Sequence, residues 1–113
     1  MKVTFIIGNL AQDSEVTHVT KTRSVCNFTV AVNERYPDSK TGEMNDFVDY
    51  FECSYWRDSE KIHKVADLLK KGVKVHVEGS PSSRGFMKND LPQSANKIEV
   101  RRIEILSALN KSN

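Results

Sequence analysis

The chain has 113 residues and a mass of 12.8 kDa, enough for one domain around a single hydrophobic core. Hydrophobic residues make up 38% and charged residues 28%, and no apolar run approaches the ~18 residues of a membrane-spanning helix, which argues against a membrane protein. The apolar stretch near the start is also too short for a signal peptide. We therefore expect a cytoplasmic protein whose cysteines, Cys26 and Cys53, are reduced.

The net charge of +2 is unevenly distributed along the chain. Residues 1–56 carry five basic and eight acidic side chains, a net charge of −3, and residues 57–113 carry twelve and seven, a net charge of +5. The overall charge is too small to indicate a nucleic-acid partner by itself. An anionic ligand is expected to contact mainly the second half of the chain, residues 57–113.

Apolar and alternating runs predict a mostly β chain. Strands are expected over residues 3–7, 15–20, 25–32, 47–56, 73–78 and 97–106. Gly8 predicts a bend or bulge at the end of the first run. Two polar segments that contain proline and glycine, 36–46 and 80–96, are expected to be loops.

One segment, residues 59–71, has helical spacing. Its apolar stripe consists of Ile62, Val65, Ala66, Leu68 and Leu69. Asp58 or Ser59 can cap the start of this helix, and Gly72 suits its end. A single helix placed among bending strands in this order predicts an all-β fold with one helix, the five-stranded OB-fold barrel. An all-β sandwich is the alternative.

The sequence offers no assembled catalytic centre. It has no paired-cysteine metal motif, phosphate loop or serine-nucleophile elbow, and its three histidines are widely separated. The acidic group of Asp46, Asp49 and Glu52 resembles a metal-nuclease set, but Asp49 and Glu52 are three positions apart and fall on opposite faces of a regular strand. We expect no catalytic residue, no metal and no cofactor.

The aromatic residues are more informative, because most of them cluster in or beside the run 47–56. Tyr50 and Trp56 share one strand face with Glu52 and Ser54, so this face is expected to meet solvent. Exposed rings on a sheet are suited to stacking nucleic-acid bases, which is worth ~1–3 kcal/mol per base. Packing of the same rings beneath loops or at a subunit interface remains an equal alternative.

Basic residues stand beside the aromatic ones three times along the chain. Arg35 precedes Tyr36, Arg57 follows Trp56, and Phe86 lies between two more cations, Arg84 and Lys88. A cation beside an aromatic ring is the pairing needed to contact a phosphate next to a stacked base. The repetition favours a nucleic acid as the ligand.

Several stretches of the chain match a known family in order and spacing. They are Ile7-Gly8-Asn9-Leu10, Ala31-Val32-Asn33-Glu34-Arg35-Tyr36, Thr41-Gly42-Glu43, Leu69-Lys70-Lys71-Gly72 and Val77-Glu78-Gly79. Over roughly residues 3–106 the chain resembles the bacterial-type single-stranded-DNA-binding proteins. The resemblance implies a nucleoid-associated homotetramer of OB barrels without catalytic activity. It is expected to bind and protect single-stranded DNA, without sequence preference, in replication, recombination and repair.

The resemblance also implies positions for the binding residues. The implied base-stacking residues are Tyr36, Tyr50, Trp56 and Phe86. The candidate phosphate contacts are Arg35, Arg57, Lys70, Lys71, Arg84 and Lys88, of which Lys70, Lys71 and Arg84 match basic positions of the family.

The chain departs from the family pattern at several places. Ala11 and Ser14 replace a glycine and a proline, and Phe51 stands where some relatives have an interface histidine. We expect an OB domain over residues 1–108 and a short tail, 109–113, which lacks the acidic tip that recruits repair proteins in the family. This lack, with the modest charge, keeps a second hypothesis open, an OB-fold replication-assembly adaptor that binds mainly protein and DNA only weakly.

Overall fold

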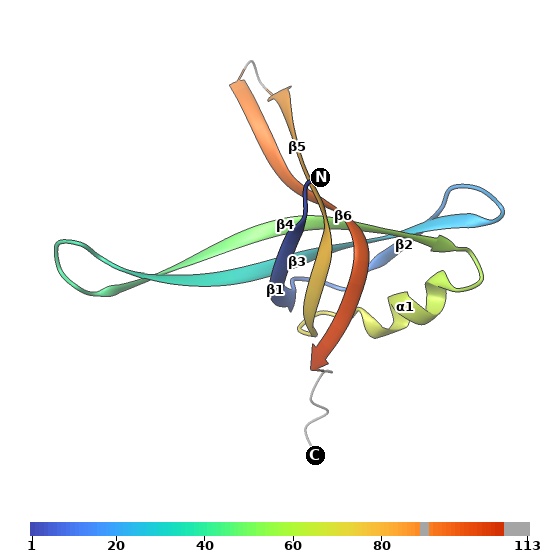
Figure 1. The fold of residues 1–113 in the computed structure, drawn as a ribbon, viewed down its shortest axis with the longest axis horizontal. Helices are drawn as coiled ribbons and strands as arrows, with labels where there is room; N and C mark the ends of the chain where they lie inside the picture. The colour runs from blue at the N-terminus through green and yellow to red at the C-terminus, as the bar shows by residue number, and fades with distance from the viewer. Residues whose placement is uncertain (89–90, 108–113) are drawn as a thin grey trace.

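The structure, a computed structural model, describes the backbone of residues 1–88 and 91–107 and the side chains of residues 1–82 and 96–107. It contains six strands and one helix (Figure 1). In chain order these are β1 (Thr4–Leu10), β2 (Glu15–His18), β3 (Arg23–Pro37), β4 (Met44–Asp58), α1 (Ile62–Leu68), β5 (Lys74–Lys88) and β6 (Leu91–Ser107).

Five of the strands close into a barrel, which confirms the predicted OB fold. The neighbours run β1-β5-β6-β4-β3, and β3 returns to β1 through the pairs Asn9↔Ala31 and Leu10↔Val30. All pairs around the ring are antiparallel except β4 with β6, which are parallel over three residues. The short β2 lies outside the ring and pairs only with the first part of β3.

The core fills the barrel from alternate positions of its strands. Val30 on β3 and Val75 and Val77 on β5 are fully buried, and α1 contributes the fully buried Ile62. The cysteines expected to be reduced, Cys26 and Cys53, are both free and buried in this core. Among the described residues no helix is long and apolar enough to cross a membrane.

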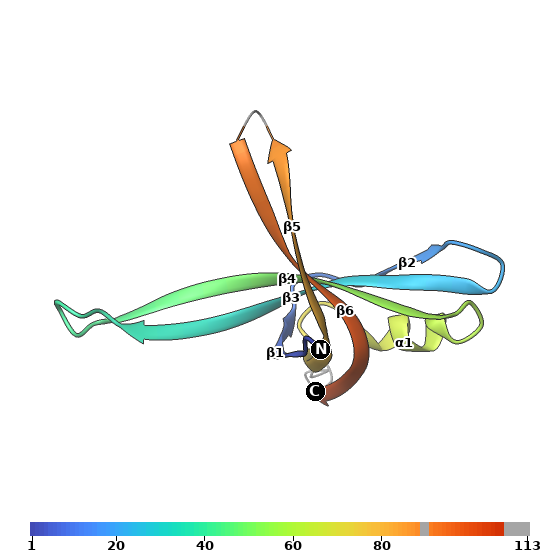
Figure 2. The same cartoon turned by 45° about the horizontal axis from the view of Figure 1, so that its top comes forward.

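The segment 80–96, expected to be a loop, is almost entirely strand in its described part, so this prediction was wrong, whereas the turn expected within 36–46 is present at residues 38–43 and is only flanked by longer strands. The β3–β4 hairpin pairs without a break out to Pro37↔Met44, and the β5–β6 hairpin pairs out to Lys88↔Leu91. Both hairpins project from the barrel as arms, most clearly in Figure 2. Hydrophobic patterning reports burial, whereas backbone groups of solvated polar residues pair equally well, so the pattern did not reveal these extensions.

The helix is shorter than the predicted 59–71 at both ends, and neither residue expected to cap its start does so. Lys61 occupies the N-cap position without a side-chain hydrogen bond, and its N–H donates to the carbonyl of Asp58 at 3.0 Å. The hydroxyl of Ser59 instead hydrogen-bonds that of the buried Ser24 at 2.8 Å. Past the helix, Gly72 has a φ of 89°, in the left-handed region that glycine adopts without strain.

Gly8 does not form the predicted bulge. β1 keeps an unbroken register with β5 from Thr4↔Gly79 to Asn9↔Lys74. A Cβ atom at Gly8 would meet the backbone oxygen of Ala31 at 2.3 Å. The glycine is therefore needed where β1 passes close to β3 and the barrel closes.

Candidate nucleic-acid interface

One face of the β3–β4 pair carries the two aromatic side chains predicted to share a face. The side chains of Tyr50 and Trp56 are 58% and 38% exposed, whereas Cys53, on the opposite side of β4, is 1% exposed. The period-two prediction for this strand is confirmed. We call this surface the outer face; it comprises Tyr50, Glu52, Ser54 and Trp56 on β4 with their partners Ala31, Thr29, Asn27 and Val25 on β3.

A polar groove of about 270 Å³ lies on the outer face between the positions of Tyr50 and Trp56. The hydroxyl of Ser54 donates to Oδ1 of Asn27 at 3.0 Å at its floor. The ammonium group of Lys97 on β6 lies 3.8 Å from a carboxylate oxygen of Glu52. The two rings thus occupy strand positions on either side of a hollow whose charged lining residues are Asp13, Glu15, Glu52 and Lys97.

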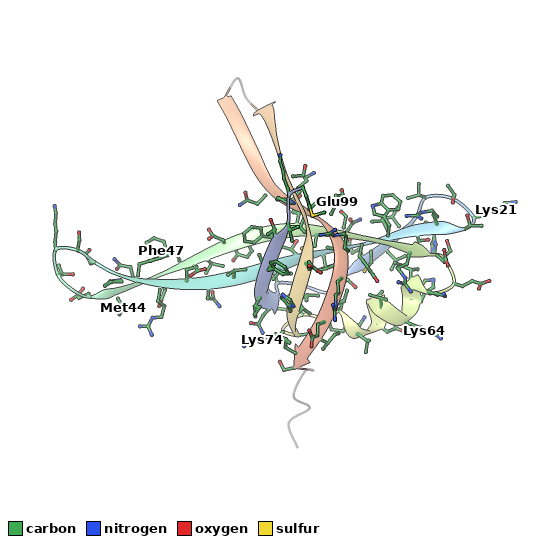
Figure 3. All side chains as sticks on the ribbon, viewed as in Figure 1. Lys21, Met44, Phe47, Lys64, Lys74 and Glu99 are labelled. Atoms are coloured by element: carbon green, nitrogen blue, oxygen red, sulfur yellow. The ribbon has the colours of Figure 1, made fainter. Side chains whose placement is uncertain are left out.

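Tyr36, a predicted stacking residue, lies on the other side of the hairpin. Tyr36 pairs in register with Asn45. Asn45 is an odd number of positions from Tyr50 on β4, so its side chain points to the opposite face from the outer-face residues. Its ring is 53% exposed and packs against Phe47, with ring centroids 5.8 Å apart. Phe47 is labelled on this arm in Figure 3. Tyr36 and Tyr50 therefore do not form one continuous stacking surface.

Two of the predicted phosphate contacts are engaged with other side chains. The guanidinium of Arg35 forms an exposed ion pair with Asp46 at 2.9 Å. The guanidinium of Arg57 donates to the hydroxyl of Tyr55 at 3.2 Å and lies 5.8 Å from the centroid of that ring. Because neighbouring residues of a strand point to opposite faces, Arg57 does not accompany Trp56 on the outer face.

The cation that lies beside Trp56 was not among the residues predicted from the sequence. The guanidinium carbon of Arg23 lies 5.8 Å from the centroid of the Trp56 ring. Arg23 precedes the run that the apolar pattern marked as a strand, and its approach to Trp56 depends on the β3–β4 register. Lys97 was missed for a similar reason, since the parallel pairing of β4 with β6 brings it to the groove.

The remaining predicted cations lie elsewhere. Lys70 and Lys71 are exposed after α1, and the backbone N–H of Lys71 donates to Asp13, which lines the groove, at 2.8 Å. Phe86, Arg84 and Lys88 fall on β5, but their side chains lie outside those that the structure describes.

The acidic group of the sequence is dispersed, as the strand period predicted. Glu52 lines the groove on the outer face, and Asp49 lines a separate hollow with Phe5 and His76. Asp46 is the ion-pair partner of Arg35. Within the described part of the chain no three histidine, cysteine, aspartate or glutamate side chains gather in a way that could hold a metal ion.

The comparison with protein families decides the assignment. The model of the single-strand binding protein family matches residues 1–106. The chain belongs to this family. Its sequence is 39% identical over 82 residues to the single-stranded DNA-binding protein of Mycobacterium tuberculosis. It is 28% identical over 108 residues to the single-stranded DNA-binding protein of Deinococcus radiodurans.

These alignments cover 72% and 95% of this family member, but only 49% and 35% of the two relatives. The chain thus matches about half or less of the length of these curated relatives. The Plasmodium falciparum SSB in complex with single-stranded DNA superposes with a TM-score of 0.77 at 21% identity, covering 95% of this chain and 96% of that one. The small single-stranded DNA-binding protein of Streptomyces coelicolor gives 0.72 at 18% identity, covering 91% and 92%.

The two thiols of this family member are poorly suited to chemistry. Burial raises the pKa of Cys53 to about 12. Burial also raises the pKa of Cys26, although a hydrogen bond with the Ser14 side chain acts in the opposite direction. Because the thiolate is the reactive form of cysteine, both groups are kept protonated at neutral pH.

Proposed function

We propose that the chain binds single-stranded DNA without sequence preference and protects it during replication, recombination and repair. The observation that carries this proposal is the pair of exposed rings, Tyr50 and Trp56, on the outer face on either side of a polar groove. A base has an apolar ring face that can stack on these side chains and polar edges that can meet the groove. Stacking does not depend on base identity, because every base has a π-face.

Phosphate contacts are proposed at the rim of this surface. Lys70 and Lys71 are exposed beyond the groove, while Arg35 must exchange its present partner for phosphate. Arg57 is held by Tyr55 on the side of β4 away from Trp56, so this proposal does not include it. An exposed ion pair such as Arg35 with Asp46 contributes ~0–1 kcal/mol, so its exchange costs little. Arg84, Phe86 and Lys88 on the β5–β6 arm stay candidates from the family resemblance.

The proposed assembly is a homotetramer in which β1 contributes a contact surface. Phe5 and Ile7 are 60% and 52% exposed, although both lie in a barrel strand. In the described part of the chain β3 pairs with β1 only at Asn9 and Leu10, so the backbone edge of Thr4–Gly8 is open on that side. An apolar strip beside an open strand edge favours pairing with a second copy.

No catalytic activity is part of this proposal, because the residues of the outer face bind and position rather than react. A cytoplasmic location suits the two free thiols. The expected tail, 109–113, lies outside the described residues.

The test is a fluorescence titration of Trp56, the only tryptophan, with oligo-dT and with duplex DNA. We expect strong quenching by oligo-dT that weakens with salt, and none by the duplex, whose bases are already stacked on each other. The slope of log affinity against log salt is expected to be ~−0.7 per neutralised phosphate. Absence of quenching and of binding at low salt overturns the proposal and leaves the adaptor hypothesis.

A further inference from the structure

The Trp56 end of the outer face carries a cation with a defined position. Val25 pairs with Trp56 and Arg23 pairs with Asp58, so Arg23 and Trp56 are diagonal neighbours on one face. The guanidinium carbon of Arg23 lies 5.8 Å from the Trp56 ring centroid, within the range of a cation–π contact. This contact holds a positive charge beside a ring that is 38% exposed.

Arg57, next to Trp56 in sequence, is placed differently. Its guanidinium is bound to the hydroxyl of Tyr55 and lies near that ring, on the opposite side of β4 from Trp56. Reaching the outer face would require this hydrogen bond to break and the side chain to pass around the strand. Sequence adjacency to Trp56 therefore does not place Arg57 beside a base stacked there.

Arg23 also keeps its charge available. Among the described side chains no carboxylate lies within 4.0 Å of it, in contrast to Arg35, which is paired with Asp46 at 2.9 Å. A guanidinium remains charged at all physiological pH values and presents its N–H groups in a planar fork that matches phosphate oxygens. Arg23 can therefore bind an anion without first giving up an ionic partner.

We propose that Arg23, and not Arg57, holds the backbone phosphate of the nucleotide whose base stacks on Trp56. The bound strand then continues past Trp56 towards the β2–β3 turn, where Lys21, labelled in Figure 3, adds a second cation. The proposal rests on the proposed function, because it assigns a contact within the same single-strand interface.

Acidic groups limit how far the strand can extend in this direction. Beyond Arg23 a hollow of about 270 Å³ is lined by Lys21, Asp58 and Glu60, among others. The two carboxylates repel a phosphate from the interior of this hollow. We therefore expect the phosphate to stay at the rim of this hollow, beside Arg23 and next to the base that stacks on Trp56.

The test compares Arg23→Gln with Arg57→Gln. The second variant is a matched control, because it removes the same charge from the residue next to Trp56 in sequence, whose side chain lies on the opposite side of β4. Oligo-dT affinity is measured for both variants and for the unchanged protein over a series of salt concentrations. We expect Arg23→Gln to weaken binding about tenfold at low salt and to reduce the steepness of the log–log salt dependence by ~0.7. Arg57→Gln is expected to stay within about twofold with an unchanged slope.

Arg23→Lys separates charge from geometry, since it should keep the salt slope while losing part of the affinity. Unfolding midpoints of all variants show whether the barrel is intact. The proposal is overturned if Arg23→Gln keeps the affinity and slope of the unchanged protein, or if Arg57→Gln loses as much as Arg23→Gln. Failure of the unchanged protein to bind oligo-dT instead overturns the proposed function itself.

Discussion

The ring of Tyr36 packs against that of Phe47, with centroids 5.8 Å apart and planes tilted by 54°, on the side of the hairpin away from Tyr50. The aromatic residues of β3 and β4 are thus divided between two surfaces. The projecting part of the hairpin, residues 33–49, carries five acidic and two basic side chains, a net charge of −3. The net negative charge of this arm opposes contact with a DNA backbone.

Alanine substitutions should distinguish these two surfaces. With an oligo-dT of about eight nucleotides, within the ~4–16 that one OB fold covers, Tyr50→Ala and Trp56→Ala should each weaken binding by ~1–3 kcal/mol. Tyr36→Ala should have a smaller effect, which grows only with longer strands that pass around the arm. Tyr55→Phe is the control, and equal losses for Tyr36→Ala and Trp56→Ala with the short strand contradict the division.

A charge on β1 should disrupt self-association. Phe5→Glu places a carboxylate on the apolar strip beside the open edge, so we expect a smaller molecular mass in sedimentation equilibrium with an intact barrel. Leu68→Glu on α1 is the matched control, because Leu68 is also 60% exposed. An unchanged mass for Phe5→Glu, or an equal effect of Leu68→Glu, argues against β1 as the contact surface.

Gly8→Ala should be strongly destabilising. The added methyl group would meet the backbone oxygen of Ala31 at 2.3 Å and a methyl group of Val30 at 2.8 Å, so the closure of β1 against β3 must shift. We expect a loss of about 1–3 kcal/mol in the free energy of unfolding, measured by urea denaturation. Gly42→Ala, at a φ of 76° with open space around it, should cost only about 1 kcal/mol, through backbone strain alone.

The turn of the β3–β4 arm should depend on acidic pH. The N–H groups of Lys40 and Thr41 donate to the carboxylate of Asp38 at 2.7 and 3.1 Å and lower its pKa below 3.8. The turn is therefore stabilised above pH 3.8, and this contribution is lost as the pH falls through the lower folded pKa. NMR should show the amide shifts of Lys40 and Thr41 following this titration, and Asp38→Asn should abolish it. Titration of Asp38 at or above 3.8 contradicts the assignment.

The thiols should be unreactive in the folded protein. With the pKa of Cys53 raised to about 12 and its side chain 1% exposed, a thiol reagent at pH 8 should label neither cysteine until denaturant is added. Because the folded pKa lies above that of the unfolded thiol, near 9.0, stability should fall as the pH rises above 9. Rapid labelling of the native protein at pH 8 contradicts the buried placement.

The features that depend on local periodicity could be predicted from the sequence. Alternation along residues 47–56 placed Tyr50 and Trp56 on one solvent-facing side and separated Asp49 from Glu52, and both inferences are confirmed. The single apolar helical stripe indicated α1, whose Ile62 is buried in the barrel. These features are readable because a side chain's face follows from its position in the repeat.

Which side chains come into contact could not be predicted in this way, because it follows from how the strands pair. The register of β3 against β4, fixed by pairing out to the turn at 38–43, brings Arg23 to Trp56 and turns Tyr36 towards Phe47. The contact between Gly8 and Ala31 arises where the barrel closes, so Gly8 alone suggested a bulge instead. Such contacts depend on the pairing of segments distant in sequence, and a pattern of polar and apolar residues within one strand does not encode its partner's register.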